Sequence, residues 1–190
     1  MRLPAFIATT MVAGLSFAGA ANAVAVTGST NGTLSNLTQC SNPATCQLVN
    51  ANQLIWGASN PNGSPNVSTS SVLNTLDGSI NDPDGLGVTL GQLTWINRAT
   101  SNGGTDDSFF ITWSVSDTFT SPVGTGTLTG LALNIQNTNN PSGDLIVGFN
   151  TNNFSATVNG YTIQNLQLVA GNGSTLTGNT WKNAEGSTGT

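Results

Sequence analysis

Charged residues are scarce in this chain, and histidine is missing altogether. Of 190 residues only 6% are charged, three are basic (Arg2, Arg98 and Lys182), and the formal net charge is -5. Nucleic-acid binding needs many Lys and Arg side chains to contact phosphates, so that class is excluded. Without histidine, neither a Ser-His-Asp triad nor a histidine-ligated metal site can form. The scarcity of Lys and Glu also excludes a coiled coil.

The first 23 residues have the character of a secretory signal peptide. Arg2 precedes an apolar run from Leu3 to Phe17, and the segment ends in Ala21-Asn22-Ala23, a small-x-small cleavage pattern. The run is too short and too rich in Ala, Gly and Thr to form a membrane span of about 20 apolar residues. We therefore expect bacterial export, removal of residues 1–23, and a secreted protein without a transmembrane anchor.

Two cysteines, Cys40 and Cys46, are separated by five residues. In an oxidising compartment they are expected to form a disulfide bond across this short loop. The alternative is a metal site, for which two thiols without further Cys or His ligands are a poor set.

What remains abundant is Thr, Asn, Gly and Ser, a composition that favours short strands and turns over helices. Segments 109–115 and 131–136 alternate apolar and polar residues with period two, which is typical of half-buried strands. Further strand candidates are Gln53 to Trp56, Leu86 to Ile96 and Leu145 to Phe149. The sequence predicts one all-β domain, an antiparallel, jelly-roll-like β-sandwich over residues 24–180, followed by a flexible tail over 181–190. A closed barrel is the alternative architecture.

One hairpin is predicted from local chemistry. Alternating residues lead into Asn159-Gly160 and away from it, and Asn-Gly suits a tight two-residue turn. Beyond Gln164 the apolar positions change parity, which indicates a β-bulge near Asn165.

Two motifs resemble the choice-of-anchor K domain, a family of exported bacterial domains. They are Ile55-Trp56-Gly57 with a polar loop after it, and Leu90-Gly91-Gln92-Leu93-Thr94-Trp95-Ile96-Asn97. The resemblance spans the chain from about Asn52 onward and implies a secreted β domain without an assigned enzymatic activity. The chain departs from the family in that no sortase-type or PEP-type anchor follows Leu168, and Trp95 stands where a histidine is expected.

Acidic turns offer candidate calcium ligands: Asp82 and Asp84 in one turn, Asp106 and Asp107 in another. Calcium prefers such flexible oxygen ligands, although Asp-Pro and Asp-Gly are also ordinary turn formers. Paired acids would serve a glycosidase as well. Most acids here lie in loop-like contexts that do not raise a carboxyl pKa.

Aromatic side chains offer a binding hypothesis. Trp95 and Trp181 are candidates for stacking on sugar rings if exposed, whereas Trp56 and Trp113 are expected to fill the core.

The sequence therefore predicts an extracellular, non-enzymatic β-sandwich that acts in adhesion, matrix or filament assembly. Its expected partners are further copies, which associate through edge strands, and surface polysaccharide. A carbohydrate-binding module is the alternative function, and a glycosidase is the third. Apart from calcium, no cofactor is expected.

Overall fold

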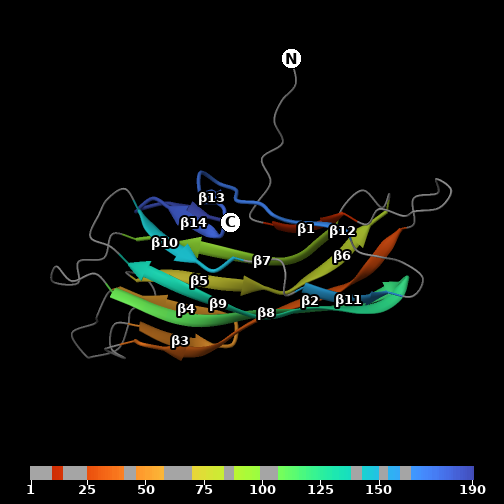
Figure 1. The fold of residues 1–190 in the computed structure, drawn as a ribbon, viewed down its shortest axis with the longest axis horizontal. Helices are drawn as coiled ribbons and strands as arrows, with labels where there is room; N and C mark the ends of the chain where they lie inside the picture. Colours follow the sequence, from red (N-terminus) through yellow and green to blue (C-terminus); the bar gives the residue numbers. More distant parts are fainter. Residues whose placement is uncertain are drawn as a thin grey trace, which may run out of the picture.

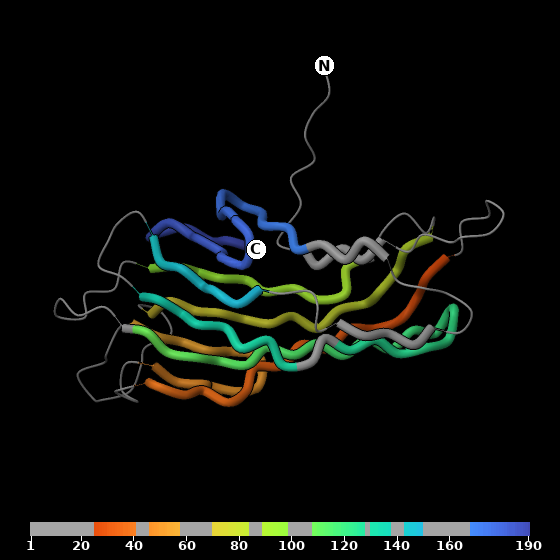
Figure 2. Tube along the Cα trace, viewed as in Figure 1, coloured from red at the N-terminus to blue at the C-terminus, as the bar shows by residue number. Residues whose placement is uncertain are grey.

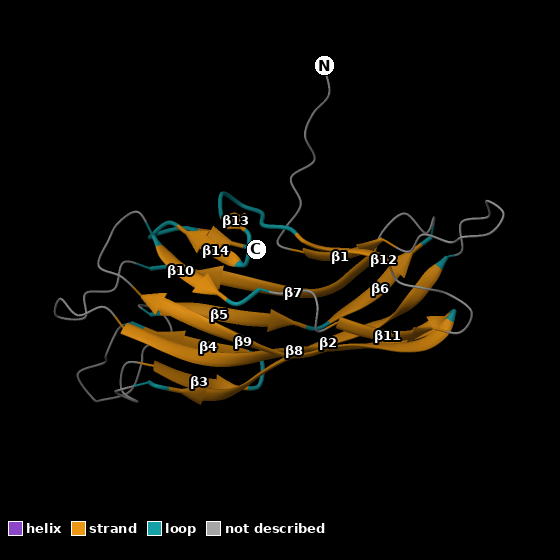
Figure 3. Ribbon diagram, in the orientation of Figure 1, coloured by secondary structure: helices purple, strands orange, loops and turns teal. Residues whose placement is uncertain are grey.

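The chain folds into two antiparallel sheets that pack face to face. The structure is a computed structural model that describes residues 10–14, 25–40, 46–57, 70–83, 88–98, 107–137, 143–149, 154–158 and 164–190. These residues form strands and turns without a helix (Figure 3). The predicted all-β sandwich is therefore confirmed.

The first sheet has seven strands in the order β12-β1-β7-β5-β4-β3, with β15 also paired to β7 (Figure 1). Its strands are β1 (Thr10–Gly14), β3 (Cys46–Asn50), β4 (Gln53–Trp56), β5 (Ser71–Leu76), β7 (Val88–Ile96), β12 (Gln164–Leu168) and β15 (Thr188–Gly189).

The second sheet has eight strands in the order β13-β14-β10-β9-β8-β2-β6, with β11 also paired to β9. Its strands are β2 (Val26–Thr38), β6 (Gly78–Asp82), β8 (Asp107–Ser121), β9 (Val123–Asn137), β10 (Asp144–Val147), β11 (Phe154–Val158), β13 (Thr175–Thr177) and β14 (Thr180–Asn183).

The long hairpin of β8 and β9 forms the centre of the second sheet, and its alternation matches the prediction. Phe109, Ile111 and Trp113 are at most 2% exposed, while the residues between them are partly exposed. Leu133 opposes Ile111 on β9 and is fully buried. Period-two patterning therefore identified the inward face of this hairpin correctly.

The two sheets are joined by side-chain hydrogen bonds that require close approach. The indole Nε1 of Trp113 on β8 donates to Thr75 Oγ1 on β5 at 3.0 Å. A Cβ at Gly32 would lie 1.8 Å from that same Thr75 oxygen. Glycine at position 32 thus makes room for the Thr75 side chain between the sheets.

The hairpin predicted around Asn159-Gly160 stays a prediction. β11 pairs with β9 in the second sheet, whereas β12 pairs with β1 in the first. Residues 159–163 themselves lie outside the described residues. The described strands before and after these residues each pair with a strand that is distant in the sequence.

The register between β1 and β12 agrees with the bulge predicted near Asn165. Val12 opposes Gln167 and Gly14 opposes Gln164, so β12 contains one more residue than β1 across this interval. An extra residue of this kind defines a β-bulge.

The expected flexible tail over 181–190 is wrong. Trp181 is fully buried on β14, and β15 pairs with the end of β7. The amide of Asn183 donates to Trp95 O at 3.0 Å, and the amide of Asn97 donates to Asn183 O at 2.8 Å. These buried amides attach the C-terminal segment to the first sheet, so the sandwich continues through residue 190 instead of ending at 180.

Candidate functional site

The disulfide bond between Cys40 and Cys46 is present, as predicted, with 6.1 Å between the Cα atoms. It links the end of β2 in the second sheet to the start of β3 in the first. Cys46 is buried opposite Trp56 and belongs to the hydrophobic core. The bridge therefore stabilises a corner of the sandwich.

The candidate stacking residues Trp95 and Trp181 are both fully buried, so the condition of exposure on which the stacking hypothesis depended is not met. Their ring centroids lie 5.3 Å apart in an edge-to-face arrangement. Trp56 lies 6.2 Å from Trp95, and Phe149 lies 5.8 Å from Trp181. The expectation that Trp56 and Trp113 are core residues is confirmed. These aromatic rings fill the space between the sheets and are closed to a sugar.

The candidate calcium ligands do not form one site. Asp82 ends β6 beside Val26, near the turn between β8 and β9, whereas Asp107 begins β8 at its far end. A strand of this length separates its ends by about 45 Å. Asp84 and Asp106 lie outside the described residues. Among the residues that are described, no three His, Cys, Asp or Glu side chains come together to hold a metal ion.

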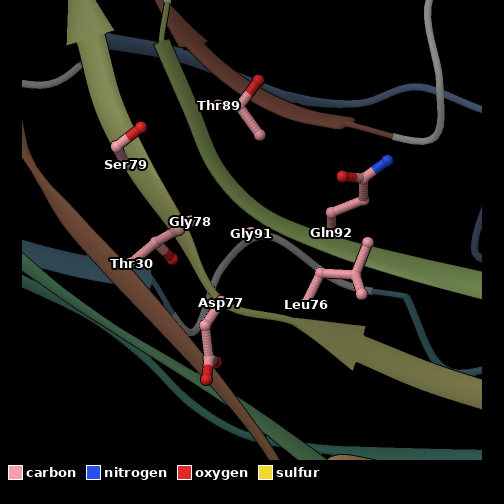
Figure 4. Close-up of a pocket in the computed structure, with 8 residues that line it drawn as sticks. All are labelled: Thr30, Leu76, Asp77, Gly78, Ser79, Thr89, Gly91 and Gln92. Carbon is pink, nitrogen blue, oxygen red and sulfur yellow. The ribbon is translucent and has the colours of Figure 1, made fainter.

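A cavity of about 240 Å³ lies where the chain crosses from β5 to β6. Figure 4 shows side chains from three elements around it: Thr30 on β2, Ser79 on β6, and Thr89 and Gln92 on β7. Asp77, at the crossover itself, accepts a hydrogen bond from Gly32 N at 3.1 Å. The lining thus combines polar side chains with the apolar Leu76 and contains no aromatic ring.

Asp117 on β8 is a buried acid that sequence reasoning did not select as a site. It is 2% exposed, and neither carboxyl oxygen has a hydrogen-bond partner in the described part of the chain. Its register neighbour Thr30 directs its hydroxyl proton to Leu90 O at 2.8 Å. Burial raises the pKa of Asp117 from 3.8 to about 7. The Thr30 side chain lowers the same pKa, but by a smaller amount.

The sequence contained a pattern that indicates burial of Asp117. The inward alternation from Phe109 to Val115 extends by two further steps to Asp117 and Phe119, and both are buried. Extending the period beyond Val115 would have placed the acid inside the sandwich.

In the described part of the sheets, the strands at the ends of the strand order pair with a neighbour on one side and have little charge. They are β3, β6, β12 and β13, whose sequences are CQLVN, GSIND, QNLQL and TLT. Lys and Pro are absent from all four, and Asp82 is their one charged residue. Charged residues and prolines are common means by which natural proteins block edge pairing.

No family model, curated protein or solved structure matches this chain. The resemblance to the choice-of-anchor K domain therefore stays a prediction.

Proposed function

We propose that this protein is an exported, non-enzymatic β-sandwich that acts through surface contacts in an extracellular matrix, in adhesion or in filament assembly. The disulfide bond supports export, because such bonds persist in oxidising compartments. The leader-like segment 1–23 supports it independently. Within the described residues no helix is long and apolar enough to cross a membrane.

The observation that carries the proposal is the chemistry of the terminal strands. β3 is the clearest case, because it ends the first sheet and presents Val49 with 43% of its surface exposed. An edge strand without charge or proline can pair with another strand through its free backbone groups. Contacts of this kind join copies without a reaction or a cofactor.

Sedimentation velocity and electron microscopy of the purified protein over a range of concentrations test the proposal. We expect self-association that increases with concentration and weakens in Val49→Lys, since a lysine on an edge strand opposes edge pairing. Val123→Lys is the matched control, because Val123 is 70% exposed but lies at the turn between β8 and β9. A protein that stays monomeric and binds neither polymer nor surface would contradict the proposal.

A carbohydrate-binding module is the second candidate, and the polar cavity beside Asp77 is the observation that favours it. Hydroxyl, amide and carboxylate groups line this cavity and are suited to sugar hydroxyls. A glycan array with Gln92→Ala and, as control, Gln47→Ala on exposed β3 tests it. Equal glycan binding by both variants would exclude this cavity as the sugar site.

A further inference from the structure

The first sheet is completed by a strand from the segment expected to be removed on export. β1 covers residues 10–14, which lie within the predicted signal peptide, and it is placed between β7 and β12 (Figure 1). It runs antiparallel to both: Val12 opposes Thr89 on β7 and Gln167 on β12.

Removal of β1 would leave the first half of β7 without a strand neighbour. On the other side of β7, the pairing with β5 ends at Leu76 opposite Gln92. β15 pairs with β7 at Trp95 and Ile96, beyond this stretch. Within the described ladders, β1 is therefore the one strand that pairs with residues 88–91, and their backbone groups need a partner.

β12 also depends on β1 for its place in the sheet. Its recorded pairing is with β1, over Gln164 to Leu168, so the described part of the sheet holds β12 in place through that strand. Two free edges would face each other across the width of one missing strand, which is about 9–10 Å between the flanking strands.

We propose that departure of the cleaved leader opens a strand-acceptor slot between β7 and β12, and that its occupant is an extended, uncharged arm of a different exported polypeptide. This inference rests on the export and leader cleavage in the proposed function. The chemistry of the slot agrees, since residues 88–92 and 164–168 carry no charge, and neither does the strand now seated there, Thr10–Gly14.

The slot has a defined register. Thr10 opposes Gln92 and Val12 opposes Thr89, so β7 has an extra residue at Leu90-Gly91 relative to its partner. A Cβ at Gly91 would lie 2.9 Å from Val115 of the second sheet, which explains why glycine stands in this bulge. An incoming strand must match this bulge as well as the one on β12.

A second copy of this chain is a poorer donor than a foreign arm. Each β-forming run in the described residues after position 24 is already a paired strand, which a donor copy would have to give up. Five of the sequences that connect these strands are instead rich in Asn, Gly and Pro, residues that disfavour strand pairing: 41–45, 58–69, 99–106, 138–142 and 150–153.

The test uses the full chain with a specific protease site inserted between Ala23 and Val24. After cleavage, native mass spectrometry is expected to show the 23-residue leader still bound to residues 24–190. A synthetic peptide of residues 8–16 is expected to replace it at one copy per chain. The same peptide with Val12→Pro is expected to bind at least ten-fold more weakly, because proline lacks the N–H that pairs with a neighbouring strand.

Amide hydrogen exchange locates the site in the same sample. Residues 88–92 are expected to exchange at least ten-fold faster without a bound strand and to recover with the 8–16 peptide, while the amides of Trp113 and Leu133 stay protected. Val12→Pro in the uncut chain gives the same readout without cleavage, so a loss of stability on cutting does not prevent the test.

Three results would overturn the inference: equal binding of the proline peptide, persistent protection of residues 88–92 without any peptide, or a strand-swapped dimer. Intact-mass analysis of the exported protein separates this inference from the proposed function. A retained leader would contradict both. An N-terminus at Val24 with normal self-association but no peptide binding would contradict the slot alone.

Discussion

The two ends of the sandwich are built differently. At one end, which we call the aromatic end, Trp56, Trp95, Trp113, Phe149 and Trp181 contact one another edge-to-face or at a tilt, with centroids 5.3 to 6.4 Å apart. At the other, the polar end, Asp117 and Thr30 lie between the sheets, and β1 covers the side of β7 (Figure 1).

Asp117 marks the boundary between the two ends. The hydrophobic core cluster includes Val115 but none of the buried apolar side chains at the polar end: Val26, Ile80, Leu90 and Phe119. A carboxyl group without a hydrogen-bond partner interrupts apolar packing and is unfavourable to bury. The large apolar cluster therefore lies at the aromatic end, whereas β1, the strand proposed to be exchangeable, pairs with β7 at the polar end.

The largest expected effect comes from breaking the aromatic end. Trp95→Ala removes a fully buried ring between Trp56 and Trp181 and is expected to lower the free energy of unfolding by about 3–5 kcal/mol, measured by urea denaturation. Trp95→Phe is the control and should lose much less, because the Trp95 N–H has no acceptor in the described structure. A loss below about 1 kcal/mol for the alanine variant would contradict the assignment of stability to this end.

The next largest expected effect on the free energy of unfolding comes from the titration of Asp117 at the polar end. Between the unfolded pKa of 3.8 and the folded pKa of about 7, the unfolded chain releases a proton that the folded chain retains. Stability due to this group is therefore greatest below about pH 4, falls as the pH rises to about 7, and is constant above. The total loss is at most about 4 kcal/mol.

Asp117→Asn tests this titration, since the amide has the same shape and no charge. The difference in unfolding free energy between variant and wild type should change by roughly 2–4 kcal/mol in favour of the variant between pH 4 and pH 8. Other acids cancel in this difference. A difference that does not vary with pH would show that Asp117 is not a buried titrating group.

The disulfide bond also contributes to the stability of the aromatic end, because Cys46 packs there. Replacing both cysteines by serine is expected to lower the free energy of unfolding by roughly 2 kcal/mol, as for closure of a short loop. Wild type treated with a reductant should match the double variant, and the variant should not respond to the reductant. Unequal values for these two samples would show that the serines themselves perturb the fold.

The smallest effect concerns the approach of the sheets at the polar end. Gly91→Ala would place a Cβ 2.9 Å from Val115 and is expected to lower the unfolding free energy by about 1–2 kcal/mol. Gly78→Ala is the matched control, because its nearest neighbour would be 3.5 Å away, an ordinary contact. Equal thermal stability of the two variants would mean that the sheets are free to separate at Gly91.

Much of the local structure was predictable from sequence. Gln53–Trp56 is a strand with the predicted bounds, and the inward residues of β8 and β9 follow the expected alternation. The disulfide followed from the spacing of the cysteines. The clearest error is the C-terminal segment, blue in Figure 2, which was predicted to be a flexible tail but contributes β14 and β15 to the two sheets.

Sequence alone determined the all-β class, several of the strands, the inward faces of β8 and β9, and the pairing of the cysteines, because these properties depend on neighbours a few residues away. The tertiary structure decided that Trp95, Trp181 and Asp117 are buried and that the last ten residues belong to the sandwich. Burial and strand pairing depend on residues far apart in the chain, and local periodicity carries no information about them.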